Sequence, residues 1–207
     1  MKRTEIKVGI IDYNVGNVNS AQSAFKRLGY NSFISKEKDE LELCSHLVLP
    51  GVGSFDEAMV QLNKSNLIPH ISSLVFENKK PILGICVGMQ LMFNYGLENK
   101  KTEGLGWVNG YVDKIKANSL KLPHVGWNEV IHNNEHLFDE IKNRSDFYFD
   151  HCYECILKDN NLSIGITKYP NKIICSIKKN NIYGVQFHPE KSQISGLKLL
   201  KNFIELC

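Results

Sequence analysis

The first half of the chain alternates short apolar runs with amphipathic stretches. The apolar runs at Lys7 to Asp12, Ser45 to Pro50 and Pro81 to Ile85 are nearly continuous, which is typical of strands buried on both faces of a sheet. From Asn19 to Leu28, apolar residues recur at helical spacing, and Gly29 fits the C-cap position. Strands that alternate with helices predict βαβ units and a mainly parallel sheet.

The second half contains more strand than helix. Several segments are rich in β-branched and aromatic residues, which favours strands. They are Val108 to Ile115, Trp127 to Ile131, Phe147 to Tyr153, Ser163 to Tyr169, Ile173 to Lys178 and Tyr183 to His188. Asn180 and Asn181 suit a hairpin turn, Ser54 and Glu57 form a capping-box pattern, and Ser192 is predicted to cap a closing amphipathic helix. We therefore predict a single domain over residues 1–207 with an α/β fold. Its open, mainly parallel twisted sheet is flanked by helices and carries an antiparallel strand extension.

Composition places the chain among ordinary globular proteins. It has 207 residues, 43% of them hydrophobic and 23% charged, and a formal net charge of +3. Its lysines are scattered and do not form the basic stripe with interleaved aromatics that nucleic-acid grooves show. No apolar run approaches the roughly 20 residues that span a bilayer, and the N-terminus lacks the core of a signal peptide. We expect a cytoplasmic protein that binds neither nucleic acid nor membrane.

The six cysteines do not form a compact disulfide framework, so we expect reduced thiols. Cys152 and Cys155 form a C-x-x-C motif beside His151. Residues three apart on a strand point to opposite faces, and no second pair completes a four-ligand site. We therefore predict no metal and no cofactor.

The most informative segment is Gly84-Ile85-Cys86-Val87-Gly88, which lies between an apolar strand and a helix. It has the pattern of a nucleophile elbow with cysteine in the place of serine. The unpaired N–H groups at a helix N-terminus favour the thiolate, which is the reactive form. A structural alternative is a buried cysteine between two glycines that serve only close packing.

A thiol nucleophile needs a base, and the base needs an orienting group. His188 ends a predicted strand, and Glu190 follows two residues later on an extended chain, so the two side chains share a face. These residues can complete a Cys-His-Glu triad. Two glycines in Pro50-Gly51-Val52-Gly53 free the backbone to donate to an oxyanion, together with the N–H of Val87.

These segments resemble the class I, triad-type glutamine amidotransferases. The resemblance rests on residues 84–90 (GICVGMQ) and 184–190 (GVQFHPE), and it covers essentially the whole chain. The loop at residues 50–53, residues 123–128 (PHVGWN) and residues 199–203 (LLKNF) narrow it to the glutaminase subunits of imidazole glycerol phosphate synthase, an enzyme of histidine biosynthesis.

The resemblance implies a role for each matching residue. Cys86 would attack the carboxamide of glutamine, His188 would move protons and Glu190 would orient His188, while the N–H groups of Val52 and Val87 would hold the oxyanion. The implied glutamine-binding residues are Gly51, Gly53, Gln90, Glu98, His151, Cys152 and Tyr153. The implied partner-interface residues are Asn17, His124, Trp127, Tyr148 and Lys191.

The resemblance also implies a partner, a (β/α)8 barrel synthase subunit that forms a heterodimer with this chain and receives the ammonia. The barrel would make imidazole glycerol phosphate and AICAR. Two residues depart from the family pattern: Asp150 replaces an apolar residue, and Cys152 replaces a serine or threonine. We expect both to affect the strength of glutamine binding more than the chemistry.

Two other functions fit parts of the sequence. A paralogous glutaminase subunit could supply ammonia to a related synthase that modifies a surface sugar. A stand-alone cysteine hydrolase would use the same elbow, although the Cys-His-Glu spacing and Gln90 favour the amidotransferase.

Overall fold

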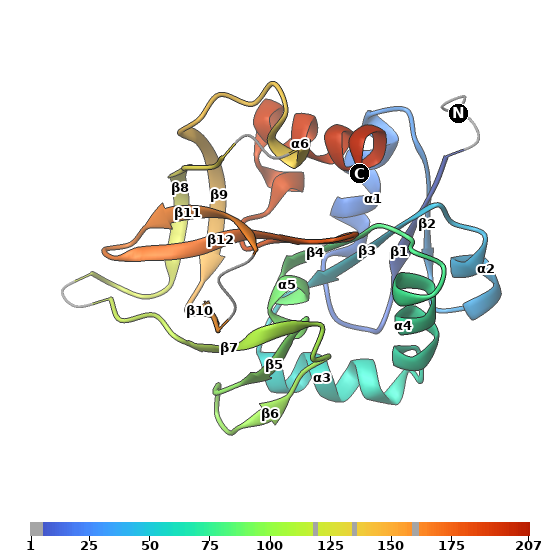
Figure 1. Ribbon diagram of the computed structural model, residues 1–207, viewed down its shortest axis with the longest axis horizontal. Helices are drawn as coiled ribbons and strands as arrows, with labels where there is room; N and C mark the ends of the chain where they lie inside the picture. The colour runs from blue at the N-terminus through green and yellow to red at the C-terminus, as the bar shows by residue number, and fades with distance from the viewer. Residues whose placement is uncertain (1–5, 118–119, 134–135, 159–161) are drawn as a thin grey trace.

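The computed structural model describes residues 6–117, 120–133, 136–158 and 162–207. Strands from the first half of the chain, joined by one strand from near its C-terminal end, form the parallel part of a mixed sheet, at the right of Figure 1. In sheet order these strands are β2 (Asn31–Ser35), β1 (Lys7–Ile11), β3 (His46–Gly51), β4 (Ile82–Cys86) and β13 (Ile182–Val185). Every residue of β3, β4 and β13 is buried, which agrees with the apolar runs of the sequence.

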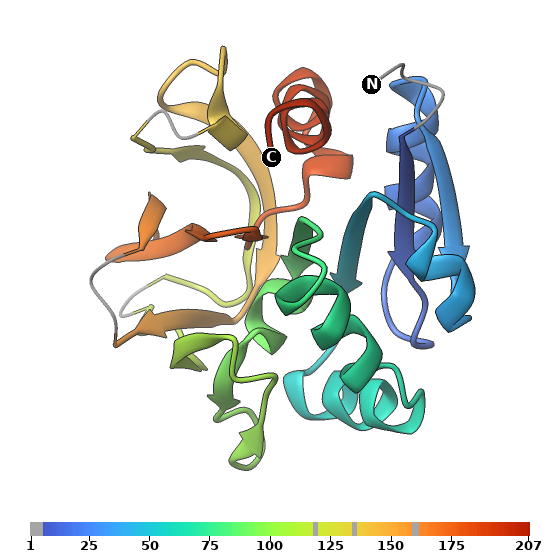
Figure 2. The ribbon, with the colours of Figure 1, turned by 45° about the vertical axis from the view of Figure 1, so that its right-hand side comes forward.

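Helices cover both faces of this parallel sheet. On one face lie α1 (Val18–Arg27) and α6 (Gln193–Leu206), which contact each other; on the other lie α3 (Phe55–Lys64) and α4 (Ile68–Phe76) (Figures 1 and 2). The short α2 (Lys38–Glu42) connects β2 to β3. The C-cap of α1 is Leu28, and Gly29, which was predicted at that position, follows it with φ +83°.

The sheet continues beyond β13 as an antiparallel extension, which confirms the predicted α/β architecture. The added strands are β12 (Lys172–Lys179), β11 (Ser163–Lys168), β10 (Tyr153–Leu157), β7 (Val108–Lys114), β5 (Phe93–Gly96) and β6 (Thr102–Glu103). Among the described residues of this extension, only β5 and β7 pair in parallel. A separate hairpin of β8 (His124–Val130) and β9 (Ser145–His151) curves beside it.

Three sequence predictions are corrected by the structure. The predicted strand from Phe147 to Tyr153 is two strands, because the chain turns at Cys152 between β9 and β10. The strand predicted to reach His188 ends at Val185. Pro189–Lys191 forms a 3₁₀ turn (η3) in place of extended chain. A second 3₁₀ turn, η2, spans His136–Phe138.

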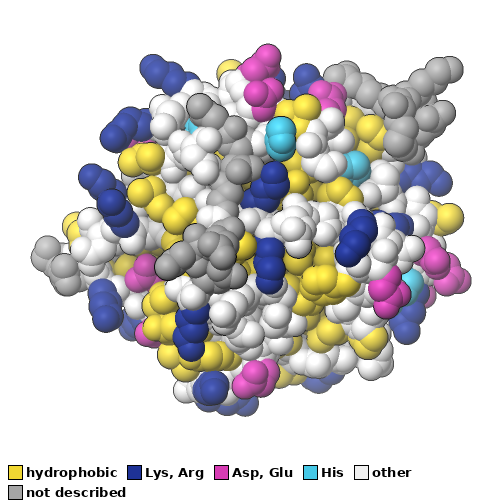
Figure 3. All heavy atoms as spheres, viewed as in Figure 1, with side chains coloured by type: hydrophobic (Ala, Val, Ile, Leu, Met, Phe, Trp, Pro, Cys, Tyr) yellow, Lys and Arg dark blue, Asp and Glu magenta, His cyan; other side chains and the backbone are white. Residues whose placement is uncertain are grey.

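Charge is dispersed on the face of the molecule that Figure 3 shows. On the face in Figure 3, lysine and arginine side chains are separated from one another by apolar and uncharged polar groups. Among the described helices, none combines the length and apolar character required to cross a bilayer.

Candidate active site

Cys86 lies on a sharp turn at the carboxyl end of β4. Its backbone has φ +55° and ψ −113°, a conformation that non-glycine residues rarely adopt and that is often stored at functional sites. The five-residue helix α5 (Val87–Leu91) follows directly. A Cβ on Gly88 would lie 1.8 Å from the carbonyl oxygen of Leu49, and a Cβ on Gly84 would lie 2.8 Å from the backbone of Gly88. Gly88 is therefore required because α5 lies close to β3, and Gly84 is required because β4 lies close to the start of α5.

His188 faces the elbow and is held from behind by Glu190. His188 Nδ1 lies 2.8 Å from Glu190 Oε1, and the two side chains are only 4% and 3% exposed. Burial alone would lower the pKa of His188, but hydrogen bonds with Cys86 and Glu190, and their negative charges, outweigh it and raise the pKa to about 10. This shift favours the imidazolium form of the ring.

The predicted contact between His188 and Glu190 is present, but the backbone achieves it differently. Pro189 begins a 3₁₀ turn, and His188 itself is extended, with φ −100° and ψ 95°. Ser192 Oγ donates to the carbonyl of His188 (2.6 Å) and accepts from the N–H of Tyr148 (2.9 Å). Ser192 therefore fixes the loop that carries His188, and its side chain does not cap α6 as the sequence suggested.

A cavity of about 580 Å³ opens over Cys86 and His188. Most of the predicted oxyanion and substrate residues line it, together with Lys191. These are Val52, Val87, Gly53, Gln90, Glu98, His151, Cys152 and Tyr153. Gly51, the remaining one, pairs with Cys86 in the register of β3 and β4, directly beside the elbow.

The cavity wall includes residues that sequence reasoning missed. Lys114, Leu122 and Pro123 line it, and Lys114 reaches it because it pairs with Tyr153 across β7 and β10. No local motif marks Lys114, since the pairing joins strands far apart in the chain. Pro123 stands in the segment 123–128 that supports the resemblance, but no site role was predicted for it. Among the described residues, no group of three or more histidine, cysteine or acidic side chains is arranged to hold a metal ion.

Glu98 is fixed at the rim of the cavity. Its Oε2 accepts the N–H of Phe55 at 2.8 Å, at the start of α3. Burial raises the pKa of Glu98, the Phe55 hydrogen bond opposes this, and the charge of Asp56 adds to the rise. The carboxylate is therefore an ordered group facing the cavity, and not a freely solvated one.

His124 is buried inside the fold, at 3% exposure, although the resemblance implied a position at the partner interface. Its Nδ1 lies 2.8 Å from His151 Nε2, and its ring stacks between Phe149 and Tyr169. His151 Nδ1 in turn donates to the carbonyl of Tyr153 at 2.9 Å. A direct contact between the His124 side chain and a docked partner is therefore not expected.

The two histidines should make the fold sensitive to acid. Burial lowers the pKa of His124 to about 4 and that of His151 to about 3. Between pH 6.5 and about 4, the unfolded chain binds protons that the folded chain does not, so stability falls as pH falls, by about 1.4 kcal/mol per pH unit for each histidine.

Urea denaturation at several pH values should show this dependence of the unfolding free energy on pH. His124→Gln should reduce the slope without removing it, because His151 remains and burial also lowers the pKa of His46 to about 4. Replacing the exposed His136 with glutamine should leave the slope unchanged, and an unchanged slope in His124→Gln would contradict the prediction.

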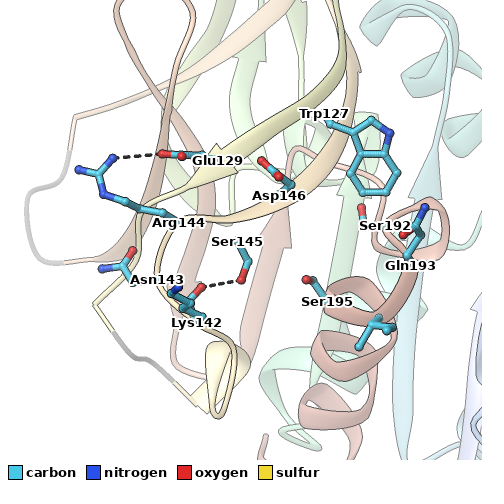
Figure 4. A pocket seen from close by; sticks show the side chains of 11 residues that line it. Trp127, Glu129, Lys142, Asn143, Arg144, Ser145, Asp146, Ser192, Gln193 and Ser195 are labelled. Carbon is cyan, nitrogen blue, oxygen red and sulfur yellow. Dashed lines mark hydrogen bonds and ion pairs between the residues drawn. The ribbon is translucent and has the colours of Figure 1, made fainter.

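Three of the predicted interface residues form one group beside His188. Trp127 is 48% exposed and its ring lies 6.1 Å from that of Tyr148, while Lys191 Nζ lies 5.4 Å from the Tyr148 ring centre. Asn17 caps α1 by accepting the N–H of Ser20, and α1 contacts η3, the turn that carries Lys191. Figure 4 shows Trp127 above Ser192 at the edge of a second cavity of about 660 Å³.

Residues 10–206 match the family described as glutamine amidotransferase class-I. The chain is 42% identical to imidazole glycerol phosphate synthase subunit HisH of Pelagibacter ubique and 46% identical to subunit HisH 1 of Campylobacter jejuni strain RM1221. The alignments cover 97% and 96% of this chain and all of each relative. The PurLQS structure of Thermotoga maritima superposes with a TM-score of 0.77 at 16% identity, over 97% of this chain and 98% of that one, which shows a shared fold.

Proposed function

The chain belongs to the class I glutamine amidotransferases, among the HisH subunits of imidazole glycerol phosphate synthase, and we propose that it is the glutaminase of that synthase. It hydrolyses glutamine to glutamate and ammonia and supplies the ammonia to the subunit that builds imidazole glycerol phosphate in histidine biosynthesis. The observation that carries the proposal is the strained elbow of Cys86 in one cavity with His188, whose ring is held by the buried Glu190.

The triad divides the reaction into two steps. The Cys86 thiolate attacks the carboxamide carbon of glutamine, and the negative charge that forms on oxygen is held by the N–H groups of Val87 and Val52. His188 begins as an imidazolium, so it can give its proton to the nitrogen as the C–N bond breaks and ammonia leaves. The neutral ring then takes a proton from water, which hydrolyses the glutamyl thioester and returns the thiolate.

Glu98 is proposed to recognise the amino end of the substrate. Its carboxylate is held by the N–H of Phe55 and faces the cavity, where it can pair with the α-ammonium group of glutamine. The remaining proposed glutamine contacts come from Gly51, Gly53, Gln90, His151, Cys152 and Tyr153.

The partner is proposed to dock over the exposed group of Trp127, Tyr148 and Lys191. Val125 lies on the same face of β8 as Trp127, and the two side chains are 55% and 48% exposed. Large exposed apolar side chains that gather at a hollow mark interaction sites, and the second cavity adjoins this group (Figure 4). Ammonia is mostly ammonium in neutral water and is then not a nucleophile, so a docked (β/α)8 barrel with a channel would keep it reactive.

Glutamate release from glutamine tests the proposal. It is measured with and without the purified barrel subunit from the same cell, in the presence of the barrel's nucleotide ligand. We expect strong stimulation by the barrel, because gating of hydrolysis by the partner prevents wasteful turnover. Glutamine hydrolysis that does not respond to the barrel would contradict the assignment to this synthase.

A further inference from the structure

Gln186 lies directly behind the nucleophile. It follows β13, its side chain is fully buried, and its Nε2 lies 3.7 Å from Cys86 Sγ, within the range of an N–H···S hydrogen bond. Its own N–H is fixed by the carbonyl of Cys175 at 2.9 Å. The side chain therefore reaches the sulfur from the strand that also leads to His188.

The orientation of the Gln186 amide is set by a chain of hydrogen bonds that begins at a backbone carbonyl. Gln90 Nε2 lies 3.2 Å from the carbonyl oxygen of Tyr153, which can only accept, so the amide nitrogen of Gln90 must face it. The same nitrogen lies 3.0 Å from Gln186 Oε1, which accepts its second proton. Only the NH₂ group of Gln186 is then left to face Cys86.

The carbonyl at the start of the chain is itself held in place. It also accepts from His151 Nδ1 at 2.9 Å, so its two lone pairs are both used. Reversing the Gln186 amide would place its oxygen against the Cys86 sulfur and its NH₂ group against the NH₂ group of Gln90. Both contacts would leave buried polar atoms without a hydrogen-bond partner. The chain thus has one favoured direction, from Tyr153 to the sulfur.

A thiolate in this position needs donors other than water. Cys86 is only 3% exposed, and a buried anion is costly unless it is hydrogen-bonded. His188 supplies one donor, but during each cycle its proton leaves with ammonia. An amide N–H cannot be lost in this way, because it does not titrate.

We propose that Gln186 is a catalytic hydrogen-bond donor to the Cys86 thiolate, and that Gln90 is a positioning residue that fixes the direction of the Gln186 amide. The proposal rests on the assignment of Cys86 as the nucleophile. The donor stabilises the sulfur anion in the resting site and again when the thiolate is expelled from the glutamyl intermediate.

Alkylation of Cys86 by iodoacetamide as a function of pH tests this without any need for glutamine turnover. In Gln186→Met, which keeps the size and loses the donor, the midpoint of the alkylation profile should move up by about one pH unit, a tenfold change in the thiolate-to-thiol ratio. Gln90→Met should move it in the same direction by less. Glutamine turnover by Gln186→Met should fall about tenfold in kcat with little change in KM.

The matched control is Asn202→Leu, which removes another buried amide, one bonded to the carbonyls of Leu137 and Asp139 far from the cavity. It should lower stability and leave the midpoint unchanged. If Gln186→Met does not fold, Gln186→Glu replaces it and should raise the midpoint further. A folded Gln186 variant with the wild-type midpoint would overturn the proposal. A shifted midpoint in a protein that never hydrolyses glutamine would overturn the proposed function alone.

Discussion

Replacing Cys86 with alanine is expected to abolish glutamine hydrolysis, with a loss of kcat on the order of 10⁴-fold or more. Among the described residues, Cys86 has the one nucleophilic side chain placed both on the elbow and against His188, and without it no thioester can form. Glutamate release measures turnover, and calorimetry measures glutamine binding, which should persist because Glu98 is untouched.

The matched control for this substitution is Cys152→Ser. Cys152 lines the same cavity but belongs to the turn between β9 and β10, where the family usually carries a hydroxyl. We expect this variant to keep or improve turnover. Activity of Cys86→Ala within tenfold of the wild type, or total loss in Cys152→Ser, would place the nucleophile elsewhere.

Gly88→Ala is expected to destabilise the fold by roughly 4 kcal/mol or more, or to prevent folding. The new Cβ would lie 1.8 Å from the carbonyl oxygen of Leu49, so α5 and β3 would have to separate. This separation would also displace Cys86. Urea denaturation measures the loss of unfolding free energy, and the rate of Cys86 alkylation shows whether the elbow is displaced.

Gly29→Ala separates steric crowding from backbone strain. Gly29 has φ +83°, and no atom lies within 4 Å of an added Cβ, so the expected cost is only about 1–2 kcal/mol from the left-handed conformation. Equal losses of stability in Gly88→Ala and Gly29→Ala would show that the close approach of Gly88 to Leu49 is not the reason for glycine at position 88.

The elbow and the triad could be predicted because their signals are local. Cys86 is marked by flanking glycines between a strand and a helix, and Glu190 follows His188 by two residues. The contact between His188 and Glu190 was predicted from an extended chain, and that reason was wrong, since Pro189 starts a 3₁₀ turn. The spacing still sufficed, because a tight turn as well as an extended chain brings residues two apart together.

The walls of the site could not be predicted in the same way. Gln186 and Gln90 meet only because β13 lies beside β4 in the sheet, and Lys114 joins the cavity through the pairing of β7 with β10. The burial of His124 likewise follows from the pairing of β8 with β9, which places it opposite His151. Such contacts depend on strand order and register, which periodicity does not specify.

Strand β2 could not be predicted from the pattern of apolar residues. Its sequence, Asn31–Ser35, carries few apolar residues, as befits a strand at the edge of the sheet, so no apolar run marks it. It forms because β1 offers a parallel partner along its whole length.

Trapping the covalent intermediate tests the central claim most directly. Protein turning over radiolabelled glutamine, with the barrel subunit present, is quenched in acid, digested and mapped by mass spectrometry. The account predicts a glutamyl thioester on the peptide that contains Cys86, and no label in Cys86→Ala. Label on Cys152, or turnover without any thioester on Cys86, would contradict it.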